Sequence, residues 1–391
     1  MKYKSLLESY SDEQTPFYFS TPEYELSVEN IYEELSFARA ADILQMFDDL
    51  KKSNRLRGRL AVGAIPFDVK EGGTLFLADS WIKQDAAWKQ REELSQAGTR
   101  ENMIFKKYHV PSPEQYMKIV ELGIEDIEKG LLDKLVLSRG IEAEFRNPVD
   151  ILPVLKNVYK NNPFGYTYAS QCKEKGILIG ASPEMLISKR GRHIYTNPLA
   201  GSRPRGKTPQ EDGKLERELQ HSSKDLAEHK FVVDYILNKF SAVCQNIKAP
   251  KKPEIIRTDQ LLHLSSVIEG DLIDPEKTVL DAALLIHPTP AVCGVPRDAA
   301  YEKILELEGR SRNEFTGIIG WCDEYGDGDW AIAIRGAKIQ NHSINIQAGA
   351  GIVKDSVPIE EMKETGVKCS TMLSAFGLDF DEGEGIWESQ R

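Results

Sequence analysis

The sequence predicts an α+β fold, in which antiparallel strands and long helices occupy separate stretches of the chain. Short β-rich runs are joined by connections too tight for helical crossovers, namely the loop 323–329 and the turn 340–342. Apolar residues recur at helical spacing in two long segments, near 213–240 and near 358–376. A doubly wound parallel sheet would instead alternate each strand with a helix.

Residues 1–107 give the weakest secondary-structure signals in the chain. Within them, 59–67 and 74–78 read as buried strands, and the polar stretch 84–107 is either a linker or a long surface helix and loop. The segment 111–130 reads as a helix that begins with the sequence SPEQ. The total of 391 residues is long enough for two or three domains, although some large enzymes fold as one unit.

After residue 131 short β-rich runs dominate the pattern. We expect strands at 135–139, 176–180, 316–321, 330–339 and 343–353. The tight connections between the last three indicate antiparallel hairpins.

Composition excludes several classes of protein. Apolar residues make up 41% and charged residues 28%, the ordinary balance of a soluble globular protein. A net charge of −11 with no basic stripe predicts no nucleic-acid partner. The five cysteines are scattered without a CxxC pair, which argues against a disulfide framework and a zinc site. Since neither a signal peptide nor a membrane-spanning run is evident, we expect a cytoplasmic protein without a membrane partner.

Two pairs of carboxylates indicate a divalent-metal site. Asp225 and Glu228 are three residues apart in the first predicted helix, and Glu361 and Glu364 are three apart in the second. This spacing places both members of a pair on one helix face, where they could supply hard oxygen ligands for Mg²⁺. Solvated surface is the alternative, and Lys368 could form an ordinary intrahelical ion pair with Glu364.

Three further residues could carry acid–base chemistry or bind an anion. Lys134 opens the run DKLVLSR, where desolvation can make a lysine a general base, although a strand-end lysine is equally ordinary. Glu184, in GASPEML, could keep its proton and act as an acid, or be a helix-start charge. Arg335, in WAIAIRGAKI, suits a carboxylate partner unless its strand exposes it.

Residues 201–208, GSRPRGKT, match the phosphate-binding pattern G-x-x-x-x-G-K-[ST]. Pro204 lies inside this loop, Pro209 directly follows it, and the neighbouring strands are expected to be antiparallel. A P-loop nucleotide-binding protein is therefore only a distant alternative.

Ten motifs then occur in the order seen in chorismate-utilising enzymes, over about residues 134–378: KLVLSR, GASPEML, PLAGSRPRG, SSKDLAEHKFVV, HLSSVIEG, LIHPTPAVCG, GIIGWCD, IAIRGAKI, QAGAGIV and KETGVKCSTML. Within that family the sequence most resembles isochorismate synthases of the siderophore (catecholate) type, notably in HPTPA and GWCD. The resemblance implies one chorismate-binding domain over 1–391, with antiparallel sheets that enclose a deep site and helices outside. The acidic stretch 379–391 looks like an extension and is expected to be disordered.

The resemblance also implies an activity and a set of site residues. The reaction would be the reversible, Mg²⁺-dependent conversion of chorismate to isochorismate, for 2,3-dihydroxybenzoate siderophore synthesis in a monomeric enzyme. Lys134 would activate water for attack at C2, and Glu184 would protonate the departing C4 hydroxyl. The remaining matches are metal-binding Glu228 and Glu364 with outer partners Asp225 and Glu361, and substrate-binding Ala200, Gly201, His263, His287, Arg335, Gly351 and Lys368.

The residues at two positions distinguish the members of this family that use different nucleophiles. Anthranilate synthases carry Gln where Lys134 stands, and aminodeoxychorismate synthases carry a nucleophilic Lys where Ala200 stands, so this pair indicates water as the nucleophile. The SRPRG segment also resembles salicylate synthases, which go on to eliminate pyruvate and are the nearest alternative. An inactive chorismate-binding paralogue is disfavoured because Lys134 and Glu184 are both present.

Overall fold

The structure is a computed structural model that describes residues 5–86, 104–162, 164–172, 176–258 and 260–378. One large sheet carries most of the strands, and all of its pairings are antiparallel. From one edge to the other its strands are β5 (Ile104–Val110), β6 (Lys134–Phe145), β20 (Ser343–Ile352), β19 (Gly336–Gln340), β8 (Ile177–Ser182), β7 (Tyr166–Gln171), β1 (Phe17–Ser20), β2 (Tyr24–Phe37), β4 (Gly73–Asp85), β3 (Leu60–Ile65), β17 (Ile318–Asp323), β18 (Gly328–Ile332), β9 (Met185–Arg190), β10 (His193–Asn197), β15 (Ile268–Leu272) and β12 (Cys244–Lys248). The short strand β16 (Gly294–Val295) pairs with the start of β6.

A second, small sheet and the helices complete the described chain. The small sheet has the antiparallel order β11 (Leu199–Pro204), β14 (Leu261–Ser265) and β13 (Glu254–Arg257). The helices are η1 (Leu6–Ser9), α1 (Ala40–Lys52), α2 (Pro113–Glu128), α3 (Ile151–Asn161), α4 (Pro209–His221), α5 (Ser223–Ser241), α6 (Val279–Ile286), α7 (Arg297–Glu308) and α8 (Pro358–Ala375). None of the helices in these described ranges combines the length and apolar character needed to cross a membrane.

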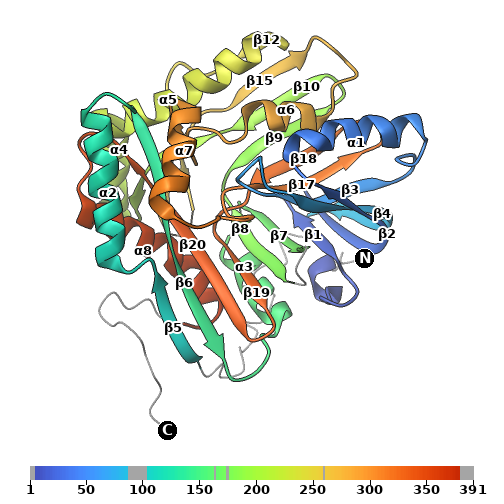
Figure 1. Cartoon of the computed structure of the whole chain (residues 1–391), viewed down its shortest axis with the longest axis horizontal. Coiled ribbons are helices and arrows are strands. Elements are labelled where there is room, and N and C mark those ends of the chain that lie inside the picture. The colour runs from blue at the N-terminus through green and yellow to red at the C-terminus, as the bar shows by residue number, and fades with distance from the viewer. Residues whose placement is uncertain (1–4, 87–103, 163, 173–175, 259, 379–391) are drawn as a thin grey trace.

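The predicted α+β class is confirmed, and so are its hairpins. β17 pairs with β18 across the predicted loop, and β19 pairs with β20 across the predicted turn. In β20 buried and partly exposed residues alternate along the whole strand, as expected where one face packs on a core. Figure 1 shows the long pair β6 and β20 side by side, and α8 packs against it.

Three sequence expectations differ from the structure. The single helix expected at 213–240 is two helices, because Ser222 ends α4 and its side chain caps α5 by accepting the Asp225 N–H. The single strand expected at 330–339 is split into β18 and β19 at Arg335, whose φ is +54°. The last residues of the expected linker 84–107 belong to β5. Its stretch 87–103 and the acidic extension 379–391 lie outside the described residues.

The large sheet curls so that its two halves enclose an apolar layer, and helices cover the outer faces. Aromatic and aliphatic side chains from β1, β2, β3, β4, β17 and β18 fill the inner layer. Outside, α1, α5 and α6 pack on one half, whereas α3 and α8 pack on the other. α2 and α7 both pack against β6. This arrangement confirms the predicted antiparallel sheets with helices outside (Figure 1).

A buried ion pair holds three separate segments together near the start of β6. Arg312 and Glu308 are both about 1% exposed and lie 2.5 Å apart. The Arg312 guanidinium donates to the carbonyls of Val136 at 2.7 Å and Val292 at 2.9 Å, and to the hydroxyl of Thr316 at 3.3 Å. These contacts fix β6, the segment after α6 and the loop before β17 relative to one another.

We expect Arg312→Met to lower the free energy of unfolding by about 3–5 kcal/mol, because it leaves the Glu308 carboxylate buried without its cationic partner. The measurement is urea unfolding. The double variant Arg312→Met/Glu308→Leu should recover part of the loss, since both charges are then removed. Lys363→Met, which breaks the exposed pair of Lys363 with Glu360, should cost no more than about 1 kcal/mol. Equal losses for the two single variants would contradict this role of Arg312.

Candidate active site

A cavity lies between the β6–β20 pair, the small sheet and the helices α5 and α8. Residues from all of these elements line it, although they are far apart in the sequence. Ten of the thirteen residues predicted from the sequence are among its lining residues: Glu184, Ala200, Gly201, Asp225, Glu228, His263, Arg335, Gly351, Glu364 and Lys368. Lys134 and Glu361 contact lining residues through ion pairs, whereas His287 is not among the lining residues.

Lys134 is fully buried at the first residue of β6, as its place in the sequence predicted. Its Nζ lies 2.9 Å from Oε1 of Glu228 on α5. Gly351 on β20 makes room for this pair, because a Cβ at this position would lie 2.3 Å from the same Glu228 oxygen and 3.2 Å from Lys134 Cε. The second glycine of QAGAG, Gly351, is therefore required by the close approach of the Glu228 and Lys134 side chains.

Glu184 is 3% exposed, just after β8, and its backbone is held on both sides. Its N–H donates to the Ser182 hydroxyl at 3.2 Å, and its carbonyl accepts from the Ile332 N–H at 3.1 Å. Burial raises the pKa of Glu184 to about 8, although the Leu199 N–H and the charge of Lys134 oppose the shift. The carboxyl therefore keeps its proton near neutral pH, which is the state that a general acid requires.

The four predicted metal-binding carboxylates each lie beside a cationic side chain. Besides Lys134–Glu228, the pairs are Lys224–Glu361 at 3.2 Å, Lys368–Glu364 at 2.5 Å and Arg203–Asp225 at 3.5 Å. With these partners, no three Asp, Glu, His or Cys side chains in the described part of the chain are placed to hold a metal ion.

The acidic pair on α8 is electrostatically unequal. Burial raises the pKa of Glu361, and the neighbouring Glu364 raises it further. Burial acts in the same direction on Glu364, but the attraction of Lys368 outweighs it and the pKa of Glu364 is lowered. Burial also raises the pKa of Asp225.

Arg335 brings to the cavity a positive charge that is attracted by Glu364 but forms no ion pair among the described residues. Its Nη1 is buried and has no hydrogen-bond partner among the described residues. Burial lowers the pKa of Arg335 to about 10, so the side chain is still charged at neutral pH. Burial, with the charges of Arg335 and Lys368, holds the pKa of His263 well below its ordinary value, so this imidazole is neutral. The left-handed backbone at Arg335 aims it at the cavity, where a regular strand was expected.

Several residues of the site were missed from the sequence. Lys224 and Ser202 line the cavity, and their positions inside the motifs SSKDLAEH and PLAGSRPRG are the only sequence signal for them. His229, which is 2% exposed, holds the Ala200 carbonyl through Nδ1 at 3.2 Å and contacts the Ser266 hydroxyl through Nε2 at 2.8 Å. His287 lies at the end of α6, where burial lowers its pKa to about 4.

The loop 201–208 is not free to cradle a phosphate. The Gly206 N–H donates to Asp212, and the Lys207 N–H donates to Glu211, both at 2.9 Å. The Thr208 hydroxyl caps α4 by accepting from the Glu211 N–H at 3.2 Å. A strand and a helix do flank the loop, but the backbone donors of a P-loop are occupied by carboxylates and the strand is antiparallel to β14. This geometry argues against nucleotide binding here.

Comparisons with known proteins show which family the chain resembles. The family model described as chorismate binding enzyme matches residues 71–377. The chain is 40% identical to isochorismate synthase DhbC of Bacillus subtilis over 90% of its length and 88% of that protein. It is 36% identical to the vibriobactin-specific isochorismate synthase of Vibrio cholerae, over 97% of both chains. A crystal structure from Bacillus anthracis, described as a 2,3-dihydroxybenzoate-specific isochorismate synthase, superposes with a TM-score of 0.88 at 34% identity, over 96% of this chain and 99% of that one.

The raised pKa of Glu184 predicts how stability depends on pH. The unfolded chain releases this proton near the ordinary pKa of 4.5, whereas the folded chain holds it up to about pH 8. Between these values the folded state binds more protons, so its stability falls as pH rises, by at most about 1.4 kcal/mol per pH unit. The variant Glu184→Gln lacks this dependence. Urea unfolding of both proteins should be measured from about pH 5 to pH 9. The free energy of unfolding of the variant, relative to that of the wild type, should rise with pH up to about pH 8. A difference that does not change with pH would contradict the assignment.

Proposed function

The chain belongs to the family of chorismate-binding enzymes, and we infer that it is an isochorismate synthase, which converts chorismate into isochorismate. The observation that carries this inference is that the buried, protonated carboxyl of Glu184 lines the cavity, while the buried Lys134 is paired with Glu228, another lining residue of the same cavity. Isochorismate formation needs both a base and an acid, because one hydroxyl must be added to the ring as another is lost.

We propose that Lys134 and Glu184 divide these roles. Once its ammonium has released a proton to solvent, Lys134 accepts a proton from a water molecule, whose oxygen forms a bond to C2 of the ring. As the double bonds shift, the bond from C4 to its hydroxyl breaks, and Glu184 donates the proton with which that group leaves as water. Lys134 gains the proton that Glu184 loses, so the overall proton count is unchanged. Because one C–O bond forms while another breaks, the reaction is expected to be reversible.

The surroundings of Ala200 support water as the nucleophile. His229 fixes the Ala200 carbonyl, and no amine occupies position 200. The neutral state of His229, whose pKa burial lowers to about 4, leaves its hydrogen bonds intact across the physiological pH range. The lack of an amine at position 200 therefore favours a nucleophile that comes from solvent.

Charge balance supports a divalent cation in the site. Asp225, Glu228, Glu361 and Glu364 already have cationic partners, so a dicarboxylate substrate adds two uncompensated negative charges. Arg335 can compensate one of them. The donor chemistry fits Mg²⁺, which prefers carboxylate oxygens together with substrate and water. We propose that Glu228 and Glu364 hold this ion with Asp225 and Glu361 as outer partners, and that bound Mg²⁺ supplies positive charge to the substrate carboxylate.

The cationic side chains of the cavity are suited to orient the substrate. We propose that Arg335 and Lys368 bind its carboxylates, since both line the cavity and Arg335 has an unused donor. Lys368 is held by the Gly349 carbonyl at 2.9 Å, which fixes the direction of its amino group. The names of the relatives support a product destined for 2,3-dihydroxybenzoate and a siderophore.

Product analysis tests this function. Purified protein should convert chorismate, in the presence of Mg²⁺, into an equilibrium mixture of chorismate and isochorismate, identified by NMR, without pyruvate. EDTA should stop the reaction, and isochorismate as the starting material should return chorismate. Pyruvate together with salicylate would make the protein a salicylate synthase instead, and no turnover would leave a chorismate-binding protein without this activity.

Variants assign the conversion to the proposed site. Lys134→Ala and Glu184→Gln should each reduce turnover by about 10²–10⁴-fold while circular dichroism shows a retained fold. Lys207→Ala is the matched control from the loop 201–208, and it should retain wild-type turnover because the Lys207 side chain lies outside the cavity lining. Full activity of Lys134→Ala would remove Lys134 from the base role. A loss in Lys207→Ala would reopen the nucleotide-binding alternative.

A further inference from the structure

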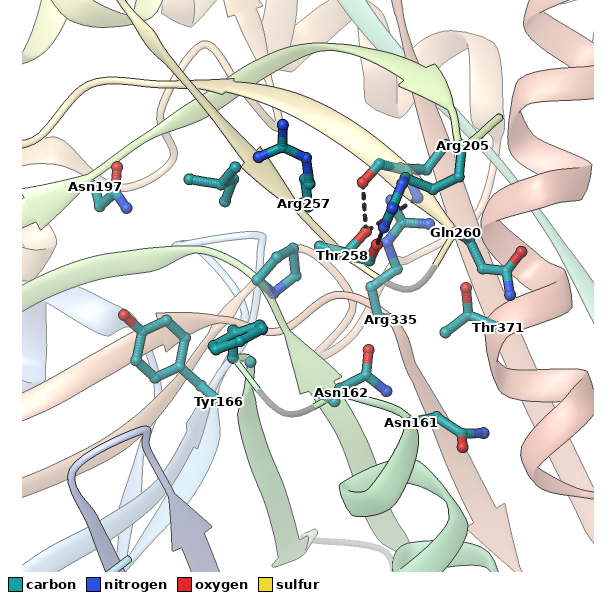
Figure 2. A pocket seen from close by; sticks show the side chains of 16 residues that line it. Asn161, Asn162, Tyr166, Asn197, Arg205, Arg257, Thr258, Gln260, Arg335 and Thr371 are labelled. Carbon is teal, nitrogen blue, oxygen red and sulfur yellow. Dashed lines mark hydrogen bonds between the residues drawn. The ribbon is translucent and has the colours of Figure 1, made fainter. Parts of the chain in front are cut away.

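A large hollow, here called the outer hollow, adjoins the catalytic cavity. Its volume is about 680 Å³, within the range of about 300–1,000 Å³ that is usual for small-molecule sites. Figure 2 shows its polar side chains, which come from the end of α3, from β10, from the small sheet and from α8. The rim is open to solvent, since Phe164 is 75% exposed and Asn161, Arg257 and Gln260 are exposed as well.

The outer hollow and the catalytic cavity share part of their walls. Pro183 and Arg335 line both spaces, and Pro183 directly precedes the proposed acid, Glu184. One face of α8 runs from the cavity to the hollow: Lys368 lines the cavity, and Thr371, three residues later, lines the hollow. Arg335 therefore stands at the boundary between the two spaces.

The lining of the outer hollow suits an anion that carries an apolar ring. Among the described residues that line it there is no Asp or Glu, although the whole chain has a net charge of −11. Its cationic residues are Arg205, Arg257 and Arg335. Arg205 and Arg257 have carboxylate partners, Asp212 and Glu216, that lie outside the lining. The remaining wall includes the apolar or aromatic side chains of Phe164, Tyr166, Ile256 and Leu261.

A second hollow also adjoins the cavity and is chemically unsuited to the same ligand. It has a volume of about 350 Å³ and shares the lining residues Phe315 and Gln347 with the cavity. It is lined by the carboxylates of Glu142, Glu144 and Glu314. Its two cationic lining residues are paired, Arg312 with Glu308 and Lys338 with Glu314. A dianion would be repelled here, because a cleft lined mainly by one sign of charge focuses the field of that charge.

We propose that the outer hollow is the entrance through which the dicarboxylate substrate reaches the catalytic cavity, and that Arg335 receives it at the boundary. This inference rests on the proposed function, which supplies the dicarboxylate. The second hollow, here called the acidic hollow, would admit water but not the dicarboxylate. If this is right, a bulky group in the outer hollow should slow the reaction, and a bulky group in the acidic hollow should not.

The natural thiols allow this to be tested by site-specific labelling, because all five cysteines are free and buried. Thr371→Cys places a thiol in the outer hollow, and Asn161→Cys provides a second position on its rim. Ser343→Cys is the matched control in the acidic hollow. Each variant is assayed with chorismate unlabelled, after methylthiolation, which adds a small group, and after reaction with a pyrene maleimide, which adds a large one. The wild-type protein treated in the same way controls for reaction at the natural cysteines.

We expect the pyrene label on Thr371→Cys and on Asn161→Cys to lower kcat/KM for chorismate at least about tenfold, and the methylthio label to change it less than about twofold. This dependence on size separates a blocked entrance from a misfolded variant. On Ser343→Cys both labels should leave kcat/KM within about twofold. Full activity of both pyrene-labelled outer-hollow variants, or a block only at Ser343→Cys, would overturn the proposal. If the unlabelled wild type forms no isochorismate, the proposed function fails instead.

Discussion

The site depends first on the buried ion pair of Arg312 and Glu308. Arg312 donates hydrogen bonds to three segments that converge from distant parts of the sequence. One acceptor is the carbonyl of Val136, two residues after the proposed base, Lys134. Glu308 extends the clamp by accepting the Ser138 N–H at 2.7 Å. The buried Arg139, also on β6, donates to the Thr365 hydroxyl and to the Met362 carbonyl of α8. Arg139 thus holds β6, which begins with the proposed base, against α8, which carries Glu361 and Glu364.

Burial gives the two acid–base groups their different properties. Glu184 has no cationic partner at hydrogen-bond distance among the described residues, so desolvation keeps it protonated. Lys134, Lys224 and Lys368 each lie against a glutamate, so most of the charge in the cavity is compensated before a ligand arrives. Arg335 forms no ion pair among the described residues and lines both the cavity and the outer hollow, so the roles proposed for it in substrate access and in substrate orientation fall on one side chain.

Much of the fold could be predicted because its signals are local. The tight loops of the hairpins, the alternation along β20 and the apolar spacing of α8 are all readable within a few residues. The break between α4 and α5 depends on one serine cap, and the break between β18 and β19 on one left-handed residue, Arg335, neither of which interrupts the apolar pattern. Lys224 was missed because its partner Glu361 is 137 residues away. His287, which family resemblance placed in the site, is outside the lining of the cavity.

The origin of the new hydroxyl tests the central claim most directly, because the account assigns it to a water molecule activated by Lys134. The reaction can be run in ¹⁸O-labelled water and stopped early, with the isochorismate analysed by mass spectrometry and NMR. The account predicts one ¹⁸O atom in each newly formed isochorismate, located at C2. Isochorismate that carries no ¹⁸O would show that the C4 hydroxyl migrates within the substrate, and the roles given to Lys134 and Glu184 would be wrong.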